Sequence, residues 1–333
     1  MPVVNQLPAL SSPPTNVYGL YQYLAQRLPG YDPSEYLREL NSAYVHVWEE
    51  ISKLKNHWFS NLQTLTVVNP QTSFDLQYNA DGALSGVLSN RLYQLMRVRV
   101  QSPSGSLWQT TKNLSPQEPR FTELSANPQQ NPVQTGPYYW YIYGRNNIQF
   151  AMPLQKGTVI EFFYTFWPIQ LNLTFAGSIQ STDTIITGAG TTFTQLLQPD
   201  FQQYQPAAKA QQEILAELVC NTNQIYAIKN IELDTLAETL TTISPTLTVG
   251  SPYVLATLPE IPREHIRVIA SIAMCKMYSV DGDDQRTEEW AAIAASNMQM
   301  MKDSLMERQG QDPPTKKRFP FGIGRGNRGF LTR

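Results

Sequence analysis

The segment 32–58 constrains the fold more than any other part of this 333-residue chain. Asp32 has the residue type of a helix N-cap, Pro33 follows in the first helical position, and Glu35 comes three residues after the cap. This arrangement is close to a capping box. Apolar residues then recur every three or four positions, at Leu37, Leu40, Tyr44, Val47, Trp48, Ile51 and Leu54. This spacing predicts a long amphipathic helix that must bury one face.

Three further segments have helical spacing. Residues 16–28 carry an apolar stripe that Pro29 and Gly30 end. Near the other end of the chain, Ile266, Ile269, Ala270, Ala273 and Met277 form one stripe, and Trp290, Ile293, Ala294, Asn297, Met301 and Leu305 form another. An Asp-rich turn at 281–284 separates these two segments. We expect the helices from both ends of the chain to form one bundle.

The middle of the chain has the pattern of β-structure. Residues 65–68 and 74–77 flank Asn69-Pro70, a predicted turn, and 92–100 and 158–167 resemble strands. The segments 138–143 and 148–152 predict a hairpin around 144–147. The segment 101–137, rich in Pro, Gln and Asn, is expected to be a long loop. Residues 172–257, dense in Thr, Gly and Ser, predict short strands and a small β domain.

The predicted fold class is α+β: a helical bundle from the N- and C-terminal segments, with a β region and an inserted small β domain. The expected divisions are an extended N-terminal arm at 1–15, the first part of a helical and β core at 16–171, the inserted β domain at 172–257, a helix pair completing the core at 258–308, and a basic extended tail at 309–333. A chain of this length commonly exceeds what one core supports.

Charge is unevenly distributed. Only 16% of the residues are charged and the net charge is -2. From 315 to 333 there are six basic and no acidic residues, so the remainder carries 19 basic and 27 acidic residues, a net of -8. A basic tail on an acidic body indicates an acidic partner or nucleic acid for the tail. A body of this charge repels DNA, which suits a protein that DNA passes through. The charge-poor surface fits either contact with other proteins or a merely polar exterior.

No enzyme motif stands out, so we expect no catalytic, cofactor-binding or metal-binding residue. The sequence has no phosphate-binding loop, no G-x-S-x-G and no H-E-x-x-H pattern. His46, His57 and His265 are too dispersed to share a metal ion, and 281–284 lacks the later ligands of a calcium loop. Cys220 and Cys275 are expected to be reduced thiols. The apolar stretch around 162–169 is too short to span a bilayer, so we expect no membrane contact.

Several short motifs, taken in order, resemble one family. Helix 32–58 carries Tyr36-Leu37, Leu40-Asn41 and Ala43-Tyr44, with Trp48 and Trp58 toward its end. An Ile-Gln-Phe-x-x-Pro strand follows at 148–153, a hydrophobic strand closes on Pro168, and Leu-Pro-Glu-Ile-Pro at 258–262 opens a helix pair. Over about 16–170 and 258–308 the chain resembles the tailed-bacteriophage head-to-tail adaptor, or connector, family, which includes upper tail-ring proteins. The β segment 172–257 departs from the family pattern.

The resemblance implies a structural virion protein of the neck, assembled in the host cytoplasm. It implies a dodecameric ring of identical subunits that binds the portal protein above and the tail, nozzle or further neck proteins below, with double-stranded DNA passing through. The residues expected to dock on the portal are Arg308, Lys316, Lys317, Arg318, Phe319, Phe321, Arg325, Arg328 and Phe330. Those expected to pack between subunits are Leu37, Leu40, Tyr44, Trp48, Ile266, Ile269, Met277 and Trp290.

Two other interpretations remain open at this point. The chain could be a carbohydrate-binding tail or receptor module, with 172–257 as the binding domain and the aromatic segment 138–143 assisting. It could also be a DNA-binding protein that uses the basic tail, in which case its DNA affinity would fall steeply with salt.

Overall fold

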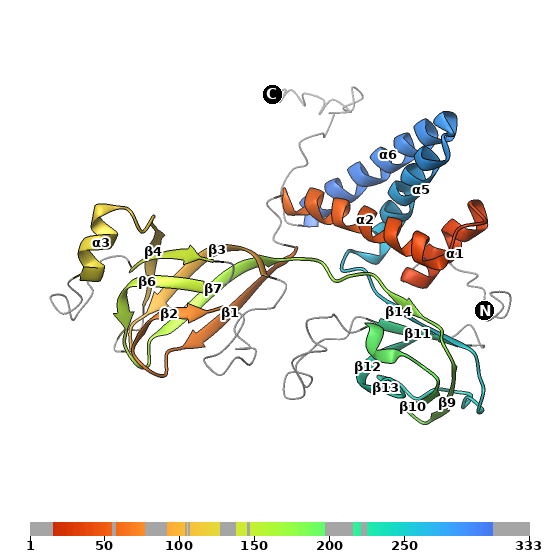
Figure 1. The fold of residues 1–333 in the computed structure, drawn as a ribbon, viewed down its shortest axis with the longest axis horizontal. Helices are drawn as coiled ribbons and strands as arrows, with labels where there is room; N and C mark the ends of the chain where they lie inside the picture. The colour runs from red at the N-terminus through yellow and green to blue at the C-terminus, as the bar shows by residue number, and fades with distance from the viewer. Residues whose placement is uncertain are drawn as a thin grey trace, which may run out of the picture.

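The computed structural model describes residues 16–54, 58–76, 92–103, 105, 107–126, 138–144, 147–196, 216–220 and 225–308. These residues form a group of helices and two β-sheets of seven strands each (Figure 1). The arm predicted at 1–15 and the tail predicted at 309–333 lie outside the described residues. Within those ranges, no helix has both the length and the apolar character needed to cross a bilayer.

Four helices from the two ends of the described chain pack together: α1 (Val17–Arg27), α2 (Pro33–Ser52), α5 (Arg267–Asp281) and α6 (Asp284–Arg308). Their buried side chains form one hydrophobic cluster with residues of the second sheet, among them Leu173, Val219, Val254 and Ala256. The helices and the second sheet therefore share one core.

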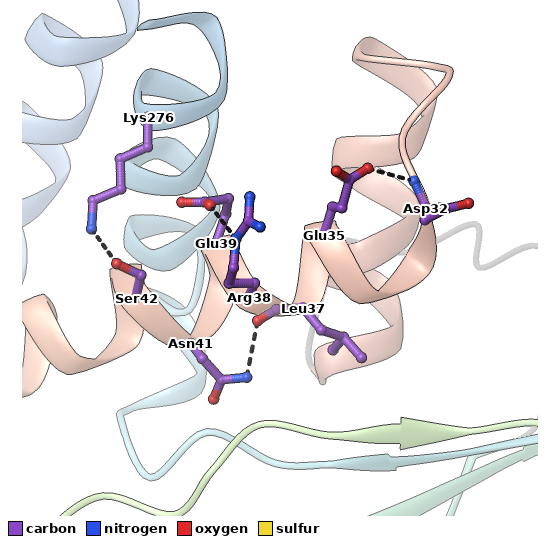
Figure 2. A network of polar contacts seen from close by, with 8 residues as sticks. All are labelled: Asp32, Glu35, Leu37, Arg38, Glu39, Asn41, Ser42 and Lys276. Carbon is purple, nitrogen blue, oxygen red and sulfur yellow. Dashed lines mark hydrogen bonds and ion pairs between the residues drawn. The ribbon is translucent and has the colours of Figure 1, made fainter. Parts of the chain in front are cut away.

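Local signals fix the ends of these helices. The Asn16 side chain caps α1 by accepting a 2.9 Å hydrogen bond from the Gly19 N–H. At the start of α2, the Asp32 N–H donates to the Glu35 carboxylate at 3.0 Å (Figure 2), which satisfies a backbone donor that the helix leaves unpaired. Gly282, at φ 74°, ends α5 in the left-handed conformation that glycine adopts without strain.

The first sheet contains β1 (Ser60–Thr66), β2 (Gln71–Asp75), β3 (Leu92–Gln101), β4 (Trp108–Asn113), β5 (Tyr138–Tyr143), β6 (Asn147–Leu154) and β7 (Val159–Phe166). Its strand order is β1-β7-β3-β4-β5-β6-β2, and only the β4–β5 pair is parallel. One face packs a core of its own, with Val98, Phe150 and Phe162 among the buried residues. On the other face, Phe121 of α3 (Pro119–Ala126) packs on Tyr139.

The second sheet contains β8 (Leu173–Thr174), β9 (Ser178–Thr182), β10 (Ile185–Ala189), β11 (Ala216–Cys220), β12 (Ile225–Leu233), β13 (Leu236–Thr239) and β14 (Tyr253–Thr257). Its order is β8-β14-β11-β12-β13-β10-β9. Every residue of β11 and β14 is buried, because these strands are covered on both faces. Val219 and Val254 face the helices, whereas Leu218 and Leu255 face the sheet's own core.

The predicted fold class, a helical bundle with β-structure attached, is wrong. Strands account for 37% of the described structure and helices for 35%, and two large sheets dominate the architecture. The strands between 60 and 166 form a sheet that has its own hydrophobic core. They are not a minor addition to a helical domain. Amphipathic helices give strong periodic signals, whereas the bulged, partly polar strands here give weak ones. A fold class predicted from periodicity alone therefore gives the helices too much weight relative to the strands.

The chain bends at Val68 and Asn69, where a turn was predicted, but the strands on either side do not pair with each other. Instead, β1 pairs with β7 and β2 pairs with β6 at opposite edges of the sheet. One local prediction in the first half is wrong, because the segment 101–137, predicted as a loop, contains both β4 and α3. The hairpin predicted around 144–147 is present, with Ile142 opposite Ile148.

Candidate functional site

Side chains on one face of α2 hold the connection between the two sheets. Residues 166–171 connect β7 to β8 and pass along α2, which also contacts the segment 258–262 that precedes α5. We call this meeting point the junction. It consists of Asn41, Tyr44 and Trp48 of α2, residues 166–171, and Glu260. The three α2 positions are three and four residues apart, so they share one face of the helix.

Asn41 binds the backbone of the connecting segment in both directions. Its Nδ2 donates to the Leu171 carbonyl at 2.8 Å, and its Oδ1 accepts from the Leu171 N–H at 2.7 Å. The same Nδ2 donates to the Leu37 carbonyl at 2.9 Å within α2. Leu171 is 1% exposed, so water cannot easily replace these partners. A buried backbone group that loses its partner costs about 1–3 kcal/mol. The Asn41 amide therefore fixes Leu171 on the helix surface.

Glu260 connects the two other segments of the junction. Its N–H donates to the Tyr44 hydroxyl at 2.7 Å, and its carboxylate Oε2 accepts from the Ile169 N–H at 3.0 Å. Its carbonyl accepts from Nε1 of Trp58 at 2.8 Å. One residue thus joins α2, the connection between the sheets and the chain that enters the first sheet.

An aromatic cluster covers the end of the junction nearest the first sheet. Trp48 is buried, and its Nε1 donates to the Phe166 carbonyl at 3.0 Å. The Trp167 ring stacks on Trp48 with 4.5 Å between ring centroids, and Tyr93 meets both rings edge-on at 4.9 and 4.7 Å. Trp167 and Tyr93 remain 40% and 49% exposed. Ring pairs of this geometry contribute about 0.5–1.5 kcal/mol beyond burial.

A second polar contact fixes the helices on the second sheet. The Glu217 carboxylate on β11 is buried, yet it accepts from Asn16 Nδ2 at 2.9 Å and from the Arg263 guanidinium at 3.0 Å. Arg263 lies in the short helix η4 (Arg263–His265) just before α5. The arginine compensates the buried negative charge, which alone would be unfavourable. The start of α1 and the approach to α5 therefore meet at one side chain of the sheet.

An ion-pair cluster joins α2 to α6. The Glu50 carboxylate accepts hydrogen bonds from the ammonium groups of Lys302 and Lys53. The hydrogen bond from Lys302, followed by that from Lys53, lowers the pKa of Glu50 from 4.5 to about 2. The carboxylate is therefore charged over the whole neutral range and holds the two helices together electrostatically.

The Asp-rich turn and the two cysteines contain the side-chain types that metal and thiol chemistry require. Across the described ranges, no group of three His, Cys, Asp or Glu side chains is placed to hold a metal ion. Asp283 in the predicted Asp-rich turn caps α6 instead, accepting from the Arg286 N–H at 3.0 Å. Both cysteines are free thiols, and burial raises the pKa of Cys220 to about 12. Cys220 is therefore a poor nucleophile at neutral pH.

The residues predicted to pack between subunits lie mostly in the chain's own core. The buried members are Leu40, Tyr44, Trp48, Ile266, Ile269 and Met277, while Leu37 and Trp290 are partly buried against the same cluster. The structure thus brings all eight together, with contacts inside one chain, and packing between subunits stays a prediction. Arg308 is the last residue of α6. The remaining predicted portal-docking residues, Lys316, Lys317, Arg318, Phe319, Phe321, Arg325, Arg328 and Phe330, lie outside the described residues.

The aromatic segment 138–143 uses much of its surface for packing. Tyr139 and Trp140 are each 5% exposed, and Tyr141 packs edge-on against Phe121 of α3 at 5.0 Å. The ring faces that a sugar would stack on are therefore engaged within the sheet at these positions.

Sequence reasoning included Asn41 and Glu260 in motifs but assigned neither a role. A signal was available for Asn41, because an amide that sits within an apolar stripe must find a buried partner. The identity of that partner, 130 residues away, is a property of the tertiary fold. In comparisons with known proteins, neither a family model nor a curated protein matches the chain.

Proposed function

We propose that this chain is a structural subunit of the ring that joins the portal vertex of a phage head to the tail, and that DNA passes through the assembled ring. The proposal starts from the resemblance to head-to-tail adaptors. In this role the protein performs no catalysis and holds no cofactor. It acts as a rigid spacer of the virion neck between the portal protein and the tail, nozzle or further neck proteins.

The observation that carries the proposal is that three of the family-like motifs meet at the junction, whereas the Ile-Gln-Phe-x-x-Pro motif lies in β6 of the first sheet. Asn41, Tyr44 and Trp48 come from the N-terminal motif, Phe166 from the strand that closes on Pro168, and Glu260 from the Leu-Pro-Glu-Ile-Pro motif. These segments are far apart in the sequence, yet each makes a backbone or side-chain hydrogen bond there. Motifs that meet in one place support a common scaffold more strongly than the same motifs counted separately.

The scaffold fits a spacer. The helices share a core with the second sheet, and the junction fixes the connection to the first sheet. A subunit with such internal contacts keeps its binding surfaces at set distances and angles, as a ring of identical copies requires. In the proposed assembly, residues 309–333 bind the portal, with Phe319, Phe321 and Phe330 as apolar anchors between basic residues. Repetition of this contact around the ring multiplies a weak individual affinity.

The test compares the full chain with a chain that ends at Arg308. Both are mixed with the purified portal complex of the same phage, and binding is measured by co-sedimentation and native mass spectrometry. We expect the shortened chain to keep the circular dichroism spectrum and unfolding midpoint of the full chain and to lose portal binding. A triple variant, Phe319→Ala, Phe321→Ala and Phe330→Ala, retains the charge and should bind more weakly than the full chain. If the shortened chain still joins filled heads to tails normally, the proposed docking is wrong.

A further inference from the structure

The outer face of the first sheet, meaning the side away from its own core, carries an apolar and basic row beyond the part that α3 covers. Leu62 on β1 lies opposite Phe163 on β7, which lies opposite Arg97 on β3. Leu62 is 47% exposed. The Arg97 side chain is 52% exposed, and its guanidinium carbon lies 5.4 Å from the Phe163 ring centroid. The row thus passes from an exposed aliphatic group, across a ring, to an exposed cation.

This face has excess positive charge. Glu161 accepts hydrogen bonds from Arg99 at 2.6 and 2.9 Å and lies 3.7 Å from Arg97. Lys112 is exposed on the same face of β4, since Arg99 pairs with Thr110 and residues two apart along a strand point the same way. Around this row, on β3, β4 and β7, three cations and one carboxylate leave a net charge of +2; Asp75 on β2, at the far edge of the sheet, points to the same side and lowers the total for the strands to +1.

The turn between α5 and α6 has the complementary character. Residues 281–289 contain five acidic side chains and one basic one, Arg286, so this turn carries a net charge of -4. Next to these residues, Val280 is 74% exposed, an unusually open position for a branched apolar side chain. Asp284 and Glu288 are also exposed. An apolar residue beside acidic groups therefore matches an apolar patch beside basic groups.

We propose that the α5–α6 turn of one copy docks on the outer face of the first sheet of a second copy. Val280 packs on Leu62 and Phe163, and Asp284 and Glu288 face Arg97 and Lys112. Figure 1 shows the turn and the first sheet at opposite ends of the molecule, so the two surfaces of one chain cannot meet each other. A contact between two different surfaces repeats head to tail and closes into a ring when the rotation per subunit permits. The inference rests on the proposed ring and names the surfaces that build it.

The contact is tested by disulfide cross-linking of full-length chains at low salt. A chain with both Leu62→Cys and Val280→Cys should give a ladder of covalent oligomers on oxidation, because each copy carries both halves of the contact. An equimolar mixture of the two single variants should stop at the heterodimer. The matched control replaces Val280→Cys by Val249→Cys, at a position that is 81% exposed but far from the acidic turn in sequence. A control that cross-links as well as the designed pair would overturn the proposal, as would the absence of a ladder.

Variants with reversed charge test whether the acidic turn of one copy is what binds the basic face of the other. Arg97→Glu with Lys112→Glu should lower the cross-linking yield about tenfold, and adding Asp284→Lys with Glu288→Lys should restore it. The yield should also fall as salt is raised, because these charges are exposed. Reversal that changes nothing would overturn the contact. Loss of cross-linking together with duplex DNA binding that depends on Arg97 and Lys112 would also overturn it, and would assign the face to nucleic acid.

A portal-binding assay distinguishes failure of the proposed contact between copies from failure of the proposed function on which the inference rests. If Leu62 and Val280 fail to cross-link while the full chain binds the portal, the pairing of surfaces fails and the proposed function stands. If the ladder forms but the chain does not bind the portal, the contact between copies stands and the neck function fails.

Discussion

Replacement of Asn41 by alanine should measure what the junction contributes to stability. The substitution removes the partners of both backbone groups of Leu171, which is 1% exposed. Each buried group left unsatisfied costs about 1–3 kcal/mol, and the better helix propensity of alanine returns roughly 0.5 kcal/mol. We expect Asn41→Ala to lower the free energy of unfolding by about 1.5–5.5 kcal/mol, with a central value near 3 kcal/mol, a large share of the total for an ordinary protein.

The assay is urea unfolding followed by tryptophan fluorescence, since Trp48 and Trp167 stack within the junction. With a urea dependence near 3 kcal/mol per molar, the expected loss lowers the midpoint by about 1 M. The control is Ser42→Ala in the next position of α2. Ser42 is exposed and accepts one hydrogen bond from Lys276 at 2.7 Å (Figure 2), so its removal should change stability by less than about 0.5 kcal/mol.

Asn41→Asp separates the two hydrogen bonds. It retains an acceptor for the Leu171 N–H but replaces the donor to the Leu171 carbonyl with an oxygen. The aspartate variant should therefore also be destabilised although its volume is nearly unchanged. Equal midpoints for the Asn41→Ala and Ser42→Ala proteins would refute the reasoning, because they would show that Leu171 finds other partners at no cost.

Three further predictions concern individual side chains. The pKa of Glu50 is lowered to about 2 from 4.5, so its ion pairs stabilise the fold above pH 4.5 and lose that effect as the pH falls toward 2. Glu50→Gln should flatten this acid limb in melting curves. The raised pKa and burial of Cys220 should protect it from iodoacetamide until urea unfolds the chain, as mass spectrometry can follow. Gly177→Ala should destabilise the second sheet by more than about 2 kcal/mol in thermal melts, because its Cβ would lie 2.3 Å from the Ala189 carbonyl oxygen. Gly250→Ala has space around it and should cost only about 1 kcal/mol of backbone strain.

The helices were predictable because their signals are local. Asn16 and the Asp32-Pro33-Glu35 sequence mark helix starts through contacts within one turn, and the structure begins α1 and α2 beside them. Gly282 ends α5 for an equally local reason. Residues within four positions of a helix end determine where the helix begins or stops, so the helix ends can be predicted from the local sequence.

The arrangement of the first sheet was not predictable from local pattern. Asn69-Pro70 indicates a turn, but it does not choose partners, and β1 pairs with β7 almost 100 residues later. Strand β3 carries register shifts near Leu92 and Leu95, which interrupt the alternation that identifies a strand. Partner choice in a sheet depends on long-range contacts, and a polar middle strand such as β4 gives little sign of its position.

The junction unites the local and the long-range features of the chain. Its three anchoring side chains, Asn41, Tyr44 and Trp48, lie on α2, the helix with the clearest signal in the sequence. The residues to which they form hydrogen bonds are 118–216 positions away in the chain. The connection between the sheets is therefore set on α2, and with it the direction of the first sheet relative to the helices. In the proposed head-to-tail contact, one surface lies on the first sheet and the other at the end of the helices. The angle between the two surfaces decides whether copies close into a ring or continue as a filament. In the proposed ring, a junction held by partly buried hydrogen bonds would keep that angle the same in every copy, so the rigidity of the junction would bear on the proposed assembly as directly as on folding.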